Sequence, residues 1–355
     1  MSHTQSHMSR QSPTEQASAE DSLLMISVVV PIRNEEQFIA DTLHELLRQD
    51  YPNDAFEIIV VDGCSTDGTI DKVKQIAESH DNVQLLENKK QWSSAARNIG
   101  IRASIGEVVI VVDGHCQFYD NQYLRNVNSA FQRTNADGLG RPQPLDVDGG
   151  SVVQKAISLA RSSRLGHHPD SYIYSKTEQT VPAHSVAVAY RRFVFDRIGY
   201  FDEQFDACED VELNQRFDDS GLHCVLAPSI SLKYHPRASI SGLFRQMTRY
   251  GRGRVRLSRK HASTLSLKSL APAFFLLFLL VGSIPAIIWP SIQLPYLCVA
   301  GAYLAVVGCF SAAIADGFRT MLWLPLVFMA IHFGAGYGSL VEFFFGSSTP
   351  SEVDR

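Results

Sequence analysis

The first part of the chain alternates between short runs of β-branched and apolar residues and longer segments with helical spacing. Four apolar runs predict buried strands, at residues 25–30, 56–61, 83–86 and 108–112. Helices are predicted between them, at 36–48, 69–79 and 94–104. Strands that alternate with helices predict a parallel sheet with helices on both faces. The expected fold class is therefore α/β, with a mostly parallel, Rossmann-like sheet.

The middle of the chain has a weaker pattern. Helical spacing returns at 121–134, 152–165 and 209–219, and short strands are predicted at 185–190, 223–226 and 230–234. The Gly-, Pro- and Asp-rich segment 136–150 is predicted to be a loop, and the polar segment 167–181 a mobile loop. Together with the first part, this pattern predicts one domain over residues 24–239.

The character of the chain changes at residue 240. Residues 240–268 are basic and partly amphipathic, which predicts a segment at a membrane interface. Three apolar stretches follow, at 270–289, 294–315 and 321–345, and each reaches the length of about 20 residues that a spanning helix needs. Three such stretches with short connections and almost no charge predict three transmembrane helices over 270–345 rather than buried core helices.

Lys and Arg predict the orientation in the membrane. They crowd the segment before the first apolar stretch, whereas the first connection, 290–293, has none and the second contains Arg319. Positive charge favours the cytoplasmic face. The large domain is therefore expected in the cytoplasm, at an inner or cytoplasmic membrane, and the short tail 346–355 outside. The adjoining apolar stretches explain the basic segment better than nucleic-acid binding does.

Composition adds two expectations to this domain organisation, one for the N-terminus and one for the cysteines. Residues 1–23 are polar and lack the apolar segment of a secretory signal, so they are expected to be a disordered tail. The six cysteines form no Cys-x-x-Cys pair, which predicts free thiols in a reducing compartment. The net charge of −5 for 355 residues is unremarkable as a mean and hides the basic cluster before the apolar stretches.

Polar residues follow the first two predicted strands, where the loops of a parallel sheet meet at one edge. The candidates for nucleotide binding in these loops are Pro31, Arg33, Glu35, Asp62, Gly63, Ser65 and Asp67. The Asp62 carboxylate is suited to accept hydrogen bonds from a pyrimidine N–H or a ribose hydroxyl. Asp67 is either a ligand or the cap of the next helix, and both alternatives stay open.

A third group of candidates surrounds the fourth predicted strand. Asp113 and His115 follow its end two residues apart, so both can reach one divalent cation beside a diphosphate. Imidazole favours Mn²⁺, with Mg²⁺ possible, although His115 could instead only hydrogen-bond nearby. His235 is a further candidate ligand. Arg97, near the start of a helix with small residues, either supports the diphosphate or metal loop or is an exposed arginine.

Two segments supply candidates for the acceptor side. Glu209 and Asp210 begin a predicted helix, and Asp210 is the candidate general base, with Glu209 beside it in the catalytic group. Alternatively, both acids only complement the helix dipole. Gln246, Arg249 and Tyr250 lie in the basic segment and are candidates for lining the diphosphate or acceptor site. The alternative for them is a purely interfacial role.

Taken in order, these motifs resemble the family 2 glycosyltransferases of GT-A fold. The resemblance covers residues 26–259 and includes segments 31–35, 61–69, 96–98, 199–203, 209–213 and 246–250, besides the Asp113 motif. It implies inverting transfer from a UDP- or GDP-sugar, with UDP favoured. It also implies that Asp62 contacts the base, Asp113 the metal, and that Asp210 is the catalytic base.

The Asp-Gly-His motif and the apolar C-terminal stretches look most like the branch with succinoglycan-type glucosyltransferases. That branch extends a polyprenyl-diphosphate-linked sugar, so the resemblance implies a lipid-linked saccharide acceptor. Two features depart from the family: the metal motif ends in His115 instead of Asp, and the Gln-x-x-Arg-Trp signature of processive synthases ends in Tyr250. One addition per acceptor is therefore expected.

Other functions remain as alternatives to single transfer. The first is a processive polysaccharide synthase, and the second is a catalytically inactive scaffold that binds nucleotide-sugars. A nucleotidyl or phosphoryl transferase is disfavoured, because the chain has no Gly-x-x-x-x-Gly-Lys-[Ser/Thr] loop.

Overall fold

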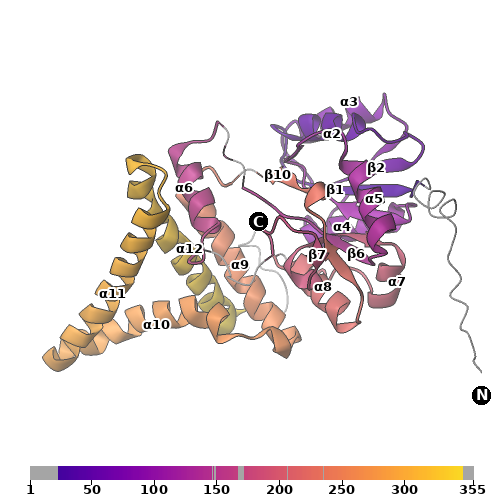
Figure 1. Cartoon of the computed structure of the whole chain (residues 1–355). Helices are drawn as coiled ribbons and strands as arrows, with labels where there is room; N and C mark the ends of the chain where they lie inside the picture. The colour runs from indigo at the N-terminus through magenta and orange to yellow at the C-terminus, as the bar shows by residue number, and fades with distance from the viewer. Residues whose placement is uncertain are drawn as a thin grey trace, which may run out of the picture.

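The computed structural model describes residues 23–145, 147, 149–166, 172–205, 207–234 and 236–346. These residues form an α/β domain and a helical region beside it (Figure 1). The predictions for residues 1–22, for His235 and for residues 347–355 lie outside the described residues.

An eight-stranded mixed sheet forms the centre of the α/β domain, with the order β3-β2-β1-β4-β8-β6-β9-β7. Its strands are β1 (Ile26–Ile32), β2 (Phe56–Asp62), β3 (Val83–Glu87), β4 (Val108–Val111), β6 (Gly138–Gly140), β7 (Gln179–Thr180), β8 (Ala187–Arg191) and β9 (Cys224–Leu226). Strands β1 to β4 pair in parallel, whereas β8 is antiparallel to both β4 and β6. Separately, β5 (Cys116–Phe118) pairs with β10 (Leu232–Tyr234). The predicted α/β fold with a mostly parallel sheet is confirmed.

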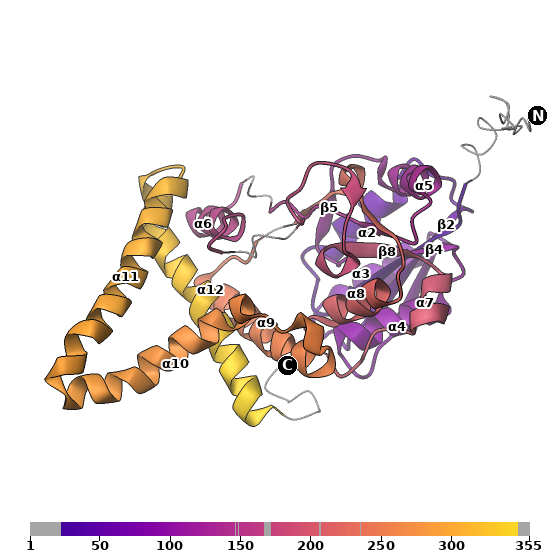
Figure 2. The ribbon, with the colours of Figure 1, turned by 60° about the horizontal axis from the view of Figure 1, so that its bottom comes forward.

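The remaining elements of this domain are helices. They are α2 (Ile39–Leu47), α3 (Thr69–Ala77), α4 (Ser93–Ala103), α5 (Tyr123–Thr134), α7 (Phe193–Ile198) and α8 (Glu209–Asp219). Helix α6 (Val152–Arg161) packs instead against the C-terminal helices (Figures 1 and 2). Short 3₁₀ turns lie at η1 (Ala183–Ser185), η2 (Pro228–Ile230) and η3 (Ala262–Thr264).

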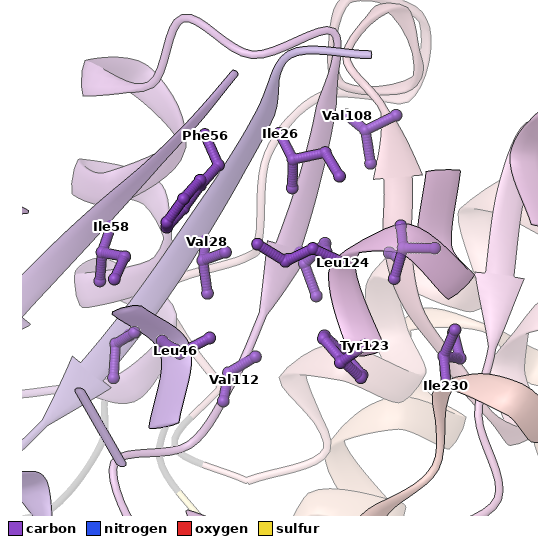
Figure 3. Packing of buried hydrophobic residues seen from close by; sticks show 14 of the residues in the cluster. Ile26, Val28, Leu46, Phe56, Ile58, Val108, Val112, Tyr123, Leu124 and Ile230 are labelled. Carbon is purple, nitrogen blue, oxygen red and sulfur yellow. The ribbon is translucent and has the colours of Figure 1, made fainter. Parts of the chain in front are cut away.

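Strand alternation gives the sheet two apolar faces, and helices cover both. On one face, Ile26 and Val28 of β1 belong to the same core as Leu46 of α2 and Leu124 of α5 (Figure 3). Residues of the opposite parity, such as Val29, belong to a second core with residues of α4 and α8. Burial on both faces explains why the strands of the parallel part read as continuous apolar runs.

Two predicted loops contain strands that the sequence does not signal. Strand β6 lies within 136–150, and β7 lies within the predicted mobile loop 167–181. Both are very short and pair with β8 or β9. In β6, a Cβ on Gly138 would lie 3.0 Å from the Phe217 ring. Tertiary contacts therefore determine these strands, and the loop predictions are wrong at those positions.

The helical region contains four long helices, which are α9 (Ile240–Lys260), α10 (Leu267–Ile288), α11 (Pro290–Ile314) and α12 (Phe318–Phe345). Of these, α10, α11 and α12 are long and apolar enough to cross a membrane, with mean hydropathies of 2.3, 2.1 and 1.5. Two views show α9 and α12 side by side, with α10 and α11 extending away from the α/β domain (Figures 1 and 2).

Glu212 connects the α/β domain to the end of α9. Its carboxylate is fully buried and lies 2.8 Å from Arg216 Nη2, 2.9 Å from Lys260 Nζ and 3.1 Å from His261 Nε2. Burial would raise the pKa of Glu212, but the hydrogen bonds from these three partners outweigh it and lower the pKa to about 2. The ionised form is therefore the one that the fold stabilises.

Replacing Glu212 with Gln should destabilise the protein by about 2–3 kcal/mol at pH 7, because the half-buried Arg216 guanidinium loses its carboxylate partner while Lys260 stays partly solvated. The contribution should be present above the ordinary glutamate pKa of 4.5 and disappear as the pH falls through about 2. Thermal unfolding of the protein in detergent measures it. Glu178→Gln, which breaks a surface pair with Arg133, is the control, and an equal loss in both variants would contradict the role of Glu212.

Candidate active site

The loops after β1 and β2 are tied together. The Asn34 N–H donates to Ser65 Oγ at 2.9 Å, and the Thr66 N–H donates to Asn34 Oδ1 at 2.8 Å. Asn34 and Cys64 have left-handed backbone angles, with φ of 55° and 58°. Such conformations persist only where surrounding contacts hold them, and they occur often at ligand sites. The two predicted nucleotide loops thus form one connected edge.

Asp62 ends β2 and is only 3% exposed. It accepts hydrogen bonds from the Ser65 N–H, at 2.9 Å, and from the Ser65 hydroxyl. The Gly63 N–H donates to the Ile32 carbonyl at 2.8 Å, so β1 and β2 stay in register at the point where both loops begin. The structure therefore brings Asp62, Gly63 and Ser65 together next to Pro31, which pairs with Val61.

Asp67 has local partners. Its carboxylate accepts from the Thr69 N–H at 3.1 Å and from the Glu36 N–H at 3.4 Å, and the Thr69 hydroxyl bonds to it as well. The hydrogen bond from that hydroxyl is the largest cause that lowers the pKa of Asp67. Of the two alternatives for Asp67, this geometry favours support of the start of α3 over ligand binding.

The Asp113-Gly114-His115 turn follows β4 and is held from two sides. His115 Nδ1 lies 2.9 Å from Glu35 Oε1, and the Thr42 hydroxyl donates to the Gly114 carbonyl at 3.0 Å. A Cβ on Gly114 would lie 2.6 Å from Ile32 Cγ2, so this close approach requires glycine. Although burial opposes the charged ring, the Glu35 hydrogen bond and the Asp113 charge raise the pKa of His115.

Glu35 therefore orients the ring of His115. A carboxylate only accepts a hydrogen bond, so Nδ1 of His115 bears the proton and Nε2 is the nitrogen suited to a metal. Glu35 is predicted to bind the nucleotide, and the structure shows that it contacts His115. Arg33 is exposed at the same edge, and its role stays a prediction.

Arg97 of α4 and Glu209 of α8 form an ion pair, with Nη1 and Oε1 3.3 Å apart and side chains 13% and 9% exposed. Burial alone would lower the pKa of Arg97, but the charges of Glu209, Asp210 and Asp113 raise it. The structure therefore gathers one cation and three acids from β4, α4 and α8. It excludes the alternative of an exposed helix-face arginine for Arg97.

Glu209 and Asp210 have different environments. Glu209 is buried against Arg97, whereas Asp210 presents exposed surface although protein atoms surround it. Burial is the main cause that raises the pKa of Asp210; the charge of Glu209 adds to it and Arg97 opposes it. Cys208 precedes both acids with φ of 62°. A group that is both accessible and a stronger base than an ordinary aspartate is suited to accept a proton.

Sequence comparison agrees with this arrangement. The model of glycosyl transferase family 2 matches residues 27–199. The succinoglycan biosynthesis protein ExoA of Rhizobium meliloti is 30% identical over 248 residues, which cover 69% of this chain and 73% of that protein. The chain belongs to glycosyl transferase family 2. It is therefore a glycosyltransferase.

Further relatives and a solved structure extend the comparison. Glycosyltransferase AglE of Haloferax volcanii is 28% identical over 269 residues, 74% of this chain and 82% of AglE. The structure of the mannosyltransferase PcManGT from Pyrobaculum calidifontis, solved with GDP-Man and Mn²⁺, matches with a TM-score of 0.57 at 19% identity. The match covers 92% of this chain and 88% of the PcManGT chain. The fold of this family 2 enzyme is GT-A.

Arg141 is a residue that sequence reasoning missed. It follows β6, is 5% exposed and lies within the electrostatic influence of Asp113 and Cys116. Within the described part of the chain, its Nε and Nη1 atoms have no hydrogen-bond partner. A buried arginine with unused donors beside an acid is suited to an anionic ligand. The Gly-Arg-Pro sequence around it is not a signal that could have indicated this.

Tyr250 of α9 lies within the influence of the Asp210 charge. Burial raises the pKa of Tyr250, the charge of Arg254 opposes the increase, and Asp210 contributes to it. The Arg254 guanidinium lies 5.5 Å from the Tyr250 ring centroid. Gln246 is half-buried and Arg249 exposed on the same helix, and their roles stay predictions.

The described residues supply only part of the predicted metal site. Among the described residues, no three His, Cys, Asp or Glu side chains lie together as a metal site. Asp113 and His115 could supply two ligands, with His115 oriented by Glu35. A cation held by only two side chains needs oxygen ligands from elsewhere, such as those of a bound diphosphate.

Proposed function

We propose that this enzyme transfers a sugar from a nucleoside-diphosphate sugar to a hydroxyl of a lipid-linked saccharide, with inversion at the anomeric carbon. The observation that supports this most is the group of Arg97, Asp113, Glu209 and Asp210. It joins the strand-end loops, which fit a nucleotide, to an accessible acid on another helix. One acid would thus lie on the donor side and another on the acceptor side.

In the proposed reaction, Asp210 accepts the proton of the acceptor hydroxyl while that oxygen attacks the anomeric carbon. The bond from the anomeric carbon to the diphosphate oxygen breaks, and the electron pair leaves with the diphosphate. Arg97 holds Glu209 and thereby positions the start of α8. Arg141 would donate to the diphosphate.

Asp113 and His115 would hold a divalent cation, which supplies neutralisation of the leaving diphosphate when it is bound. An imidazole ligand favours Mn²⁺ over Mg²⁺, and the structural neighbour PcManGT was solved with Mn²⁺. Asp62 is the candidate contact to a pyrimidine base, which favours a UDP-sugar. The neighbour was solved with GDP-Man, so a guanine donor is the main competitor.

A cavity supports a lipid-linked acceptor. Its volume is about 390 Å³, and its lining combines cationic and apolar side chains, among them Arg164, Tyr250, Arg254, Lys268, Phe275 and Tyr303. Cations beside an apolar wall fit the phosphate and the first hydrocarbon units of a lipid carrier. Tyr250 also lies within the influence of the Asp210 charge, so a sugar on such a carrier would be near the proposed base.

Two further observations support the acceptor and the membrane face. A relative from Methanococcus voltae, 26% identical over 245 residues, is named as a glucuronosyltransferase acting on a dolichyl N-acetylglucosaminyl phosphate. The concentration of Arg and Lys in α9 favours a cytoplasmic position for the α/β domain.

The first experiment measures binding of UDP-, GDP-, dTDP- and CMP-sugars to the purified full-length protein in detergent, with Mn²⁺, with Mg²⁺ and with EDTA. One class, UDP favoured, should bind with micromolar affinity and weaken at least about tenfold in EDTA, because the diphosphate loses its counter-cation. Binding of none would contradict the donor site. Binding without transfer to any lipid-linked saccharide would support the scaffold alternative.

A further inference from the structure

The C-terminal part of helix α9 is fastened to the α/β domain. At its end, Lys260 Nζ lies 2.9 Å from Glu212 Oε1. In its middle, Gly253 is so close to the domain that a Cβ there would lie 2.6 Å from the Ala207 carbonyl oxygen. Its 21 residues correspond to about 31 Å of helix. A polar domain attached to residues 253–260 opposes a path of the whole of α9 through the bilayer.

The charges of α9 lead to the same conclusion. Seven cationic residues lie on this helix: Arg245, Arg249, Arg252, Arg254, Arg256, Arg259 and Lys260. Each Arg or Lys at the centre of a bilayer costs about 3 kcal/mol on insertion scales. Helix α9 therefore lies along the membrane surface, with its exposed cations, such as Arg245 and Arg249, at the level of the headgroups.

Helix α12 runs beside α9 in the same direction. A Cβ on Gly334 would lie 2.9 Å from the Phe244 carbonyl oxygen, and one on Gly338 would lie 2.0 Å from the Thr248 carbonyl oxygen. Further along, Arg259 Nη2 donates to the Phe343 carbonyl at 3.1 Å. The two helices thus stay in contact from Phe244 to Arg259 of α9.

Glu342 holds the second half of α12 against α9. Its side chain is fully buried, with Arg252 Nε at 3.2 Å, Arg256 Nε at 3.0 Å and Arg259 Nη1 at 3.6 Å. Near the middle of α12, His332 Nε2 lies 2.9 Å from the Leu165 carbonyl oxygen, after the end of α6. These contacts join α12 to α9, whose end is attached to the α/β domain through Glu212, and to the segment after α6.

The other two apolar helices differ from α12. In their most apolar windows, only 11% of α10 and of α11 is buried, against 50% of α12. They meet at Trp289, and residues 288–293 around this junction have no charge, whereas the outer ends of the pair lie near Lys268 and near Asp316 and Arg319. A hairpin with an uncharged tip and cationic ends is typical of two membrane crossings.

We propose that α12 lies in the plane of the membrane between α9 and the lipid, and that only α10 and α11 cross it. The exposed apolar residues of α12 are its lipid-facing surface, among them Phe318, Leu322, Leu326, Tyr337, Phe343 and Phe344. The C-terminal end of α12 then lies on the same face as the α/β domain. The prediction of an outside C-terminus counted α12 as a third crossing because of its length and apolarity alone.

Sidedness of the full-length protein in sealed vesicles tests this. Protease-cleavable tags at the N- and C-termini report on which side of the membrane the α/β domain and the tail lie. A cysteine at the tip of the hairpin, Gln293→Cys, reports the side of the tip through labelling with a membrane-impermeant maleimide. The accessible native cysteines are removed for this purpose by Cys64→Ser, Cys298→Ser and Cys309→Ser. Both tags should be cleaved from one side and Cys labelling should come from the other. A C-terminal tag cleaved from the tip's side, or all three sites reacting from one side, would overturn the proposal, whatever the outcome of the donor assay.

Discussion

Replacing Asp210 with Asn should lower the rate of sugar transfer about 1,000-fold, within the range that general bases contribute. Asparagine has nearly the same shape but does not accept a proton from the acceptor hydroxyl. The Arg97–Glu209 ion pair does not involve the Asp210 side chain, so donor binding should stay within about twofold, below 0.5 kcal/mol. Initial rates with a lipid-linked acceptor and titration with the donor separate the two effects.

Asp219→Asn is the matched control for this variant, because Asp219 ends the same helix and accepts a hydrogen bond from Gln215. It should transfer sugar at nearly the original rate. Normal turnover by Asp210→Asn, or an equal loss in both variants, would remove Asp210 from the role of base.

The same carboxylate should determine the acidic limb of the rate profile. The base acts only when it is ionised, and burial together with Glu209 raises the pKa of Asp210 above 3.8. The rate should therefore fall, as the pH is lowered, at a higher pH than an ordinary aspartate would give. In Asp210→Asn the residual rate should lose this dependence.

The regular half of the α/β domain could be predicted from the sequence because its signals are local. Strands β1, β2 and β4 are apolar runs that the chain buries on both faces, and the predicted helix 209–219 coincides with α8. The candidate residues at the strand ends come together for the same reason, since parallel strands end at one edge of the sheet.

Other features depend on contacts between distant residues, and sequence patterns do not encode those contacts. Glu35 and His115 are 80 positions apart, and each is only a polar residue after a strand when it is considered alone. Strands β6 and β7 are too short to have a period. The partners of Glu342 and His332 in α12 are likewise not encoded in the sequence of that helix.

The second large effect is expected at the candidate metal site. Asp113→Asn should reduce transfer about 100- to 1,000-fold, because losing several kcal/mol of stabilisation of the leaving diphosphate has that effect on rate. Donor affinity should also become insensitive to EDTA. The comparison of donor titrations with Mn²⁺ and with EDTA measures this directly.

Glu35→Gln should give a smaller and more specific effect. It leaves both proposed ligands in place and removes only the charge that orients His115 through Nδ1, so Mn²⁺ affinity should fall about 10- to 100-fold and excess Mn²⁺ should restore transfer. Asp120→Asn is the control, since Asp120 lies in the turn after β5 and accepts only from the Gln122 N–H among the described contacts of its side chain. If Glu35→Gln lost donor binding equally with and without metal, Glu35 would contact the nucleotide, as the sequence first indicated, and would not act through His115.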